Sequence, residues 1–354
     1  MLIINDVHIG AVRKGGTTPE TQALIRGHLQ SGLRDQLASA DNHVVINGDL
    51  FDAFTVEPAE VVKVYETLAD WLNGNDRRML TLIQGNHDWN PRGDKLSSFH
   101  LLAHFMSSRY GEHVVRVIDK GYTPVAAGVW AIPHMPNQDL FDMEIAKATM
   151  PGNEGGRYLL LHANYCSTFA EHADHSLNVS AEQVAALGAA GWHLIFGHEH
   201  QGRTLPFATI VGNQWPSSIA DCLAHGSAQK DGAKYALRIT GGGDLQKIQT
   251  WSAKDDYIEM DWRELDVEAT QRFIRITGDA SAAEAEAAVS AIARFRQKSK
   301  ALIVGNAVKV EGVSVDMEGF EGSVGEAIKS FDVLSALLEE LSPREAEVVK
   351  GLMQ

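Results

Sequence analysis

The sequence has few cysteines and no long apolar run. Cys166 and Cys222 form neither a Cys-x-x-Cys pair nor the spacing of a disulfide framework, so we expect reduced thiols in a cytoplasmic protein. The longest apolar stretches, such as residues 158–161, are strand-sized and fall well short of the roughly 20 residues that a membrane span requires. The chain enters an apolar strand at residue 2 without the basic and apolar regions of a signal peptide. These absences predict a cytoplasmic protein with no membrane partner.

Basic residues are also scarce. The chain holds 31 Lys and Arg against 46 Asp and Glu, for a net charge of −15. Because binding to nucleic-acid phosphates normally draws on Lys and Arg, this balance weakens a nucleic-acid interpretation. The acidity is uneven, however, since residues 311–354 contain ten acids and three bases. Acidic residues that ligate metal ions would also repel DNA less, because the bound cation reverses the sign of the local charge. The charge therefore disfavours a DNA partner without excluding one.

The first 200 residues alternate short apolar runs with helical patterns. Strands are expected at residues 2–5, 43–47 and 79–84, with helical spacing at residues 20–39 and 61–72 between them. This order predicts an α/β fold in which helices cover the faces of a sheet. Ligands in such folds bind in loops at the carboxyl ends of strands.

The pattern changes after residue 200. Strands are expected at residues 209–211, 235–240 and 246–251, and a charged, aperiodic stretch at 254–270 indicates a domain junction. A small α/β unit follows, with a strand at 273–277, a helix at 281–298 and a strand at 301–310. The apolar spacing near the C-terminus predicts an amphipathic helical hairpin. Its apolar stripe is expected to pack either on a partner protein or on the rest of this chain.

Five polar clusters follow expected strands, where this architecture places active sites. Two divalent ions roughly 3.5–4 Å apart can clamp a phosphoester, and such a site needs N and O ligands on rigid loops with one shared carboxylate. Taken singly, an Asp-x-His is most often chance, and a histidine after an apolar run is most often a core residue. In combination the clusters predict a two-metal phosphoesterase, built from Asp6, His8, Asp49, Asn86, His87, His162, His198 and His200.

The ordered motifs Asp6-x-His8, Gly48-Asp49, Gly85-Asn86-His87-Asp88, His162 and Gly197-His198-x-His200 resemble those of the calcineurin-like metallophosphoesterase superfamily. The resemblance implies a β-sandwich flanked by helices, with the alternating β/α pattern describing only its edges. It implies two divalent metal ions, one held by Asp6, His8, Asp49 and His200 and the other by Asp49, Asn86, His162 and His198. It also implies that His87 binds the scissile phosphate or protonates the leaving oxygen, while Asp88 orients that imidazole or caps the loop.

Within this superfamily the chain resembles the SbcD-type DNA repair nuclease subunits of bacteria and phages. The resemblance includes residues 6–10, 48–52, 85–88, 131–133 and 212–217. The chain departs from the pattern at Asp52, where some relatives carry His. The resemblance implies a Mn²⁺-dependent exonuclease or endonuclease that acts on DNA as a homodimer within a heterotetramer. The implied domains are a nuclease domain at 1–260, a small α/β DNA-capping domain at 261–320, and helices at 321–354 that dock on an SbcC-type coiled-coil ATPase.

Two other interpretations stay open. A stand-alone phosphatase, or a phosphodiesterase for small molecules or cyclic nucleotides, would share the metal site but need neither the capping unit nor the tail. A non-catalytic scaffold would recruit an ATPase but have no use for an intact ligand set.

The first loop also contains Arg13 and Lys14, which would contact DNA phosphates or lie in solvent.

Overall fold

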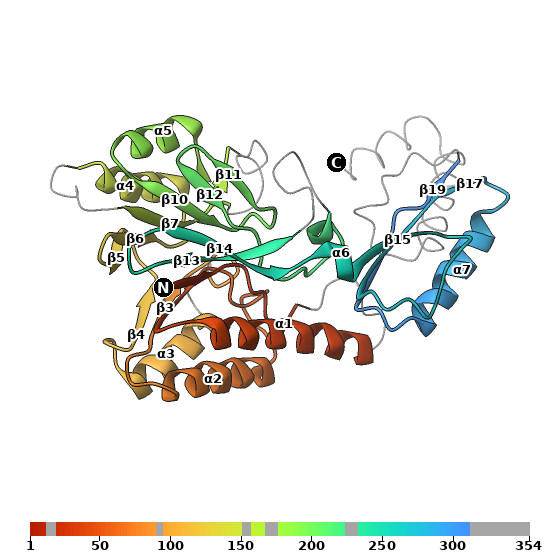
Figure 1. The fold of residues 1–354 in the computed structure, drawn as a ribbon, viewed down its shortest axis with the longest axis horizontal. Coiled ribbons are helices and arrows are strands. Elements are labelled where there is room, and N and C mark those ends of the chain that lie inside the picture. The colour runs from red at the N-terminus through yellow and green to blue at the C-terminus, as the bar shows by residue number, and fades with distance from the viewer. Residues whose placement is uncertain (12–18, 90–94, 151–156, 167–175, 224–232, 312–354) are drawn as a thin grey trace, which may run out of the picture. The chain divides into compact units, whose positions relative to one another are not determined.

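The computed structural model describes residues 1–11, 19–89, 95–150, 157–166, 176–223 and 233–311. The chain divides into two compact units, Met1–Asp256 and Tyr257–Gln354, which are shown in Figure 1. The helical hairpin expected at 321–354 and the loop with Arg13 and Lys14 lie outside the described residues. Within the described part of the chain, no helix is both long and apolar enough to cross a membrane.

Two six-stranded sheets form the first unit. The first sheet runs in the order β14 (Leu245–Trp251), β13 (Lys234–Ile239), β1 (Leu2–Ile4), β2 (His43–Asn47), β3 (Met79–Ile83) and β4 (Val115–Ile118). The second runs in the order β11 (Arg203–Leu205), β12 (Ala208–Ile210), β10 (His193–Gly197), β7 (Tyr158–His162), β6 (Val129–Ile132) and β5 (Thr123–Ala126).

Four neighbouring strands of each sheet are parallel. In the first sheet β1, β2, β3 and β4 pair in parallel, and in the second β12, β10, β7 and β6 do so. Antiparallel pairing occurs only toward the edges, at β13, β14, β11 and β5. The expectation that the β/α alternation describes only the edges of the sandwich is therefore wrong. The helices between them carry the chain from one parallel strand to the next, so the alternation describes the parallel part of each sheet, from β1 to β4 and from β6 to β10.

Helices cover the outer faces of both sheets (Figure 1). The first sheet carries α1 (Pro19–Ser39), α2 (Pro58–Asn73) and α3 (Ser98–Tyr110), and the second carries α4 (Gln138–Ala148) and α5 (Ala181–Ala189). Local sequence fixes where these helices begin: Ser180 and Gln183 form a reciprocal capping box at α5, and the Ser97 hydroxyl accepts the His100 amide at α3. The predicted β-sandwich flanked by helices is confirmed.

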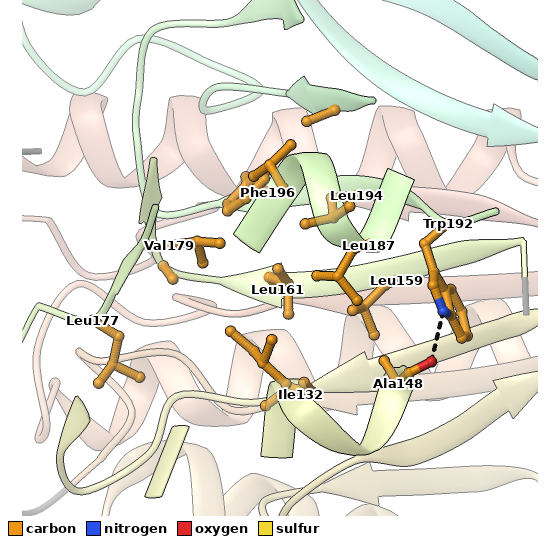
Figure 2. Close-up of a cluster of buried hydrophobic side chains, with 14 of the residues drawn as sticks. Ile132, Ala148, Leu159, Leu161, Leu177, Val179, Leu187, Trp192, Leu194 and Phe196 are labelled. Atoms are coloured by element: carbon orange, nitrogen blue, oxygen red, sulfur yellow. Dashed lines mark hydrogen bonds between the residues drawn. The ribbon is translucent and has the colours of Figure 1, made fainter. Parts of the chain in front are cut away.

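Strand β7 shows why these strands are apolar throughout. Leu159 and Leu161 pack toward the helices that cover the second sheet, as Figure 2 shows, while Tyr158 and Leu160 pack toward the first sheet. Because both faces are buried, the strand lacks the polar alternation of a half-exposed one. In the helix layer the Trp192 indole donates to the Ala148 carbonyl at 2.9 Å, which satisfies its one polar group (Figure 2).

The second unit has its own core. Its parallel sheet joins β15 (Tyr257–Asp261), β16 (Phe273–Thr277) and β18 (Ile303–Asn306), and α7 (Ala285–Lys298) packs on it through Ile292 and Phe295. The short strands β17 (Asp279–Ala280) and β19 (Lys309–Val310) also pair. Two sequence expectations need correction: the stretch at 254–270 contains β15, and the strand expected at 301–310 is divided into β18 and β19. Strand β15 was missed because it exposes charged residues on one face.

Candidate metal centre

The residues singled out from the sequence lie together where parallel strands of the two sheets end. Strands β1, β2 and β3 lead into the loops of the first sheet, and β7 and β10 supply the second sheet's contribution. Carboxyl ends of neighbouring parallel strands meet at one edge of a sheet, so these loops converge. In chain order the residues are Asp6, His8, Asp49, Asn86, His87, His162, His198 and His200.

Four of these residues have a backbone conformation that residues with side chains rarely adopt. The angle φ is 49° at Asp6, 52° at His8, 47° at Asp49 and 88° at His198. Each such conformation costs on the order of 1–3 kcal/mol and persists only where the surroundings hold it. Here the His8 amide donates to the Asp49 carbonyl at 3.0 Å and the Asp6 amide to the Gly48 carbonyl at 3.4 Å. Hydrogen bonds between the loop after β1 and the loop after β2 therefore hold Asp6, His8 and Asp49 in their strained backbone conformations.

Glycines make room for the converging side chains. A Cβ atom at Gly48 would collide with the His162 imidazole, and one at Gly85 would collide with the Asp49 carboxylate. Gly48 also has a φ of 83°. The glycines next to the predicted ligands are thus needed for the close approach of backbone and side chain.

Asp6, His8 and His200 form a first cluster of donor atoms. The Nε2 atoms of His8 and His200 face each other at 2.9 Å, and the ligand atoms of all three residues lie within 4.8 Å of one another. The Asp6 carboxylate accepts the His198 amide at 2.9 and 3.1 Å, which fixes its orientation. Donors about 2.0–2.2 Å from one ion have a mutual spacing of this order.

Asp49, His162 and His198 form a second cluster, which Asn86 joins. The His162 Nε2 atom lies 3.3 Å from the Asp49 Oδ2 atom. The Asn86 Oδ1 atom is 3.0 Å from that nitrogen and 2.9 Å from the Nδ1 atom of His198. An amide oxygen, a carboxylate and two imidazoles therefore surround one point.

Asp49 lies between the two clusters. Its Oδ2 atom is 3.3 Å from His162 Nε2 on one side and 4.0 Å from His8 Nε2 on the other. The side chain is almost fully buried. A carboxylate in this place is available to both clusters, as a site for two ions requires.

Comparison with known families agrees with this geometry. Residues 1–202, which contain all eight residues, match the family described as calcineurin-like phosphoesterase. The chain belongs to this family. It is accordingly a metal-dependent hydrolase of phosphoester bonds, and the two donor clusters are where the phosphoesterase would hold its divalent ions.

Other comparisons add little to this assignment. The chain is similar to the solved structure titled as the protein of unknown function AQ665 from Aquifex aeolicus, with 14% identity, a TM-score of 0.25, and coverage of 51% of this chain and 88% of that one. A likeness this weak carries no argument about function. No curated protein matches the chain.

The donor set of the phosphoesterase centre fits divalent cations. Every side chain in it offers a carboxylate oxygen, an amide oxygen or an imidazole nitrogen, the donors that hard and borderline divalent ions accept. The two facing nitrogens of His8 and His200 need a shared cation or proton between them. The phosphoesterase fold thus brings together buried oxygen and nitrogen atoms that could coordinate a cation.

Burial and ion pairing shift the pKa values of the side chains in the two clusters. Burial alone would raise the pKa of Asp49, but the charge and hydrogen bond of His162 hold it well below its usual range. Against the effect of burial, Asp49 raises the pKa of His162 to about 9. Burial, reinforced by the charge on His162, lowers the pKa of His198 to about 3. A cation that enters here must therefore displace the proton of His162.

His87 occupies a more open position than the ligands. Its side chain is 27% exposed, against 1% for His8, and its Nε2 atom is 3.9 Å from Asp49 Oδ2. Its Nδ1 atom donates to the Asp52 carbonyl oxygen, and its amide donates to Asp49 Oδ1 at 3.0 Å. The hydrogen bond at Nδ1 therefore fixes the ring, and its Nε2 atom lies on the side of the metal centre.

Two carboxylates that were not assigned to the site lie next to its imidazoles. Asp52 Oδ1 lies 3.2 Å from His8 Nδ1, and Asp221 Oδ1 lies 3.0 Å from His200 Nδ1. In both cases the contact leaves Nε2 turned toward the first cluster. The contact at His200 is a hydrogen bond, and a carboxylate bonded in this way behind a metal-binding histidine fixes its tautomer and ring orientation.

Asp221 is itself anchored by its neighbours. It lies in a short 3₁₀ helix, Ala220–Cys222, and its Oδ2 atom accepts the amides of Ser217 and Ser218 at 2.8 and 2.9 Å. The Ser218 hydroxyl accepts the Asp221 amide in return at 3.3 Å. The Ser-x-x-Asp spacing of a capping box was thus present in the sequence, but nothing in it links this turn to His200, which is 21 residues away.

Asp88 caps its loop. Its Oδ2 atom accepts the Gly85 amide at 2.9 Å and its Oδ1 atom accepts the Phe51 amide at 3.5 Å. Burial raises the pKa of this carboxyl to about 7. Of the two roles left open for Asp88, the geometry favours the cap, because the His87 ring is held by the Asp52 carbonyl.

Proposed function

We propose that the chain is a Mn²⁺-dependent DNA nuclease of the SbcD type, acting in DNA repair or recombination. The main support is a set of three overlapping donor groups, two of which share Asp49, in a chain that continues into a second α/β unit from Tyr257 onward. The groups are Asp6, His8 and His200; His8, Asp49 and His87; and Asp49, His162 and His198. The family match ends at residue 202, so this unit lies outside the segment that makes the metal centre. We assign it to capping the DNA, since a phosphatase of small substrates has no need of it.

The roles of the residues follow from their positions. Two divalent ions, when bound, would supply activation of water and neutralisation of charge at the phosphate. Asp6, His8, Asp49 and His200 would hold one ion, and Asp49, Asn86, His162 and His198 the other. His87, whose Nδ1 atom is held by the Asp52 carbonyl, is placed to bind the phosphate or to protonate the leaving oxygen from Nε2.

The proposed assembly uses the end of the chain. Residues 321–354 would dock on the coiled-coil base of an SbcC-type ATPase, and two copies of the chain would take part in a heterotetramer. The acidic tail supports a protein partner at this end, because ten acids and three bases among residues 311–354 would repel DNA. The ATPase would then control the access of DNA to the metal centre.

The test is an assay of the purified full-length chain with Mn²⁺. Linear DNA, bis(p-nitrophenyl) phosphate and a cyclic nucleotide serve as substrates, with and without a candidate ATPase. We expect Mn²⁺-dependent cleavage of DNA that Asp49→Ala abolishes, because this variant lacks the carboxylate between the clusters. Hydrolysis of the small esters with no cleavage of DNA would instead establish the stand-alone phosphatase or cyclic-nucleotide phosphodiesterase. Absence of any hydrolysis would favour the scaffold.

A further inference from the structure

His200 differs from His162 in how its main chain is held. His162 is the last residue of β7 and pairs with Gly197 of β10, so the ladder of the second sheet fixes its backbone. Strand β10 ends at Gly197, and His200 therefore lies three residues beyond it, in a loop. A ligand in a loop needs contacts other than a strand ladder to keep its backbone in place. The contacts of the His200 main chain thus bear on how precisely this nitrogen donor is placed.

Lys234 makes the shortest hydrogen bond to the His200 carbonyl oxygen. It is the first residue of β13, in the first sheet, and its Nζ atom donates to that oxygen at 2.9 Å. The Asn213 amide donates to the same oxygen at 3.4 Å. Gly212 leaves room for these bonds, because a Cβ atom there would lie 2.7 Å from the oxygen. The bond from Lys234 therefore ties the loop after β10, in the second sheet, to the first sheet.

Lys234 is buried, with only 3% of its surface exposed. Removal of an ammonium group from water is costly unless the group gains a hydrogen bond or a counter-charge. Burial lowers the pKa of Lys234, and the charge of Asp221 opposes that effect. For the strand alone an apolar side chain of similar size would be at least as stable at this place. The bond to His200 gives this lysine a role that the strand does not require.

Lys234 and Asp221 hold the two ends of the same ligand. Asp221 Oδ1 lies 3.0 Å from Nδ1 of the His200 ring, while Lys234 binds the His200 carbonyl. The first contact limits rotation of the ring, and the second limits movement of the main chain that carries it. The Nε2 atom of His200 then faces the Nε2 atom of His8 at 2.9 Å, in the first cluster.

We propose that Lys234 is a positioning residue of the metal centre, which raises the affinity of the first cluster for its divalent ion by holding the His200 carbonyl. The inference requires the phosphoesterase centre and not a DNA substrate, so its failure is distinct from failure of the nuclease proposal. A lysine that acted on the centre only through its charge would repel a cation, and its removal would tighten binding. The positioning role predicts the opposite sign.

The test measures Mn²⁺ binding by isothermal titration of the full-length chain in two backgrounds, each of which leaves one cluster whole. His162→Gln removes a ligand of the second cluster, and His8→Gln removes a ligand of the first. Lys234→Met, which loses the donor and the charge, is added to each background, and thermal melting confirms folding. Lys247→Met is the matched control, because Lys247 is an exposed lysine of the adjacent strand β14 whose Nζ atom binds the Thr204 hydroxyl at 3.0 Å.

In the His162→Gln background we expect Lys234→Met to raise the Kd of the remaining Mn²⁺ about tenfold, as the loss of a residue behind a metal ligand does. In the His8→Gln background the Kd should not change, since His200 is not among the donors of the second cluster. Lys247→Met should leave the Kd unchanged in both.

An unchanged or lower Kd for Lys234→Met in the His162→Gln background would overturn the positioning role. Equal losses in both backgrounds would also overturn it, because a residue that only stabilises the fold would affect both clusters. If Lys234→Met does not fold, Lys234→Leu, with an apolar side chain suited to a buried strand, takes its place and is judged by the same outcomes.

Discussion

At the level of single residues, the metal centre depends on orientation as much as on ligand identity. His8, His162 and His200 each direct Nε2 toward a cluster while Nδ1 contacts a protein oxygen, at Asp52, Asn47 and Asp221 respectively. An imidazole fixed at Nδ1 in this way presents its other nitrogen to the ion at little further entropic cost. The residues behind the ligands are therefore expected to affect metal affinity.

Replacement of Asp221 tests this expectation. Asp221→Ala should weaken Mn²⁺ binding by about 10–100-fold, because His200 loses the carboxylate that fixes its tautomer and ring orientation. The measurement is isothermal titration of the full-length variant with Mn²⁺, alongside thermal melting to confirm folding. Asp244→Asn, at an exposed acid in the same unit, is the control. An unchanged Mn²⁺ affinity in folded Asp221→Ala would contradict the positioning role.

Replacement of His87 should affect catalytic turnover but not metal binding. We expect His87→Gln to retain both metal ions but to lower kcat by about 10²–10⁴, because the group proposed to bind the phosphate or to protonate the leaving oxygen is lost. Metal content by mass spectrometry and cleavage of linear DNA, whose alkoxide leaving group needs a proton, supply the two readouts. Loss of metal from this variant would show that His87 is a ligand.

At the level of elements, the sequence predicted the buried central strands better than the edges. The expected strands at 43–47 and 273–277 have the bounds of β2 and β16. Strand β15 was interpreted as a junction because Glu259 and Asp261 interrupt its apolar positions. An edge strand is specified mainly by pairing with its neighbour, which local pattern does not reveal.

His43, at the start of β2, should make this strand sensitive to acid. Its burial, with smaller effects of the N-terminal ammonium and Arg116, lowers its pKa to about 4. Since the unfolded chain has a pKa of about 6.5 at this residue, it binds the proton first, and stability is full above that pH and falls as pH drops toward 4. His43→Gln should keep the contact with Thr81 and reduce the loss of unfolding free energy between pH 7 and pH 5 by about 2 kcal/mol.

Urea denaturation at the two pH values measures this effect. His113→Gln, at an exposed histidine, is the control and should lose stability on acidification as the wild type does. If His43→Gln shows the same loss as the wild type, the burial of His43 does not couple folding to protonation.

At the level of the whole molecule, the chain joins the unit that carries the metal centre to a second unit that supplies none of the predicted ligands. The donor atoms lie within the 202 residues of the phosphoesterase match, while the second unit has a separate apolar core around Ile274 and Phe295. Such a division is expected where catalysis and the selection of substrate or partner are carried by different parts of one chain.

Deletion of residues 324–354 tests the role proposed for the end of the chain. We expect loss of association with the ATPase and retention of weak Mn²⁺-dependent cleavage, because the metal ligands all precede residue 201. Size-exclusion chromatography with the candidate ATPase and a nuclease assay measure the two properties. A complex that forms as well without these residues would place the docking surface elsewhere.

The sequence by itself determined the fold class and the residues that meet at the metal centre, because buried parallel strands leave continuous apolar runs and their loops must converge at one edge. Tertiary structure alone decided that Asp221 contacts His200 and that the carbonyl of Asp52 accepts a hydrogen bond from His87. These contacts join segments that are far apart in the chain, and the hydrophobic periodicity of the sequence does not indicate which distant segments meet. Their partners are set by how the two sheets pack, which local pattern does not encode.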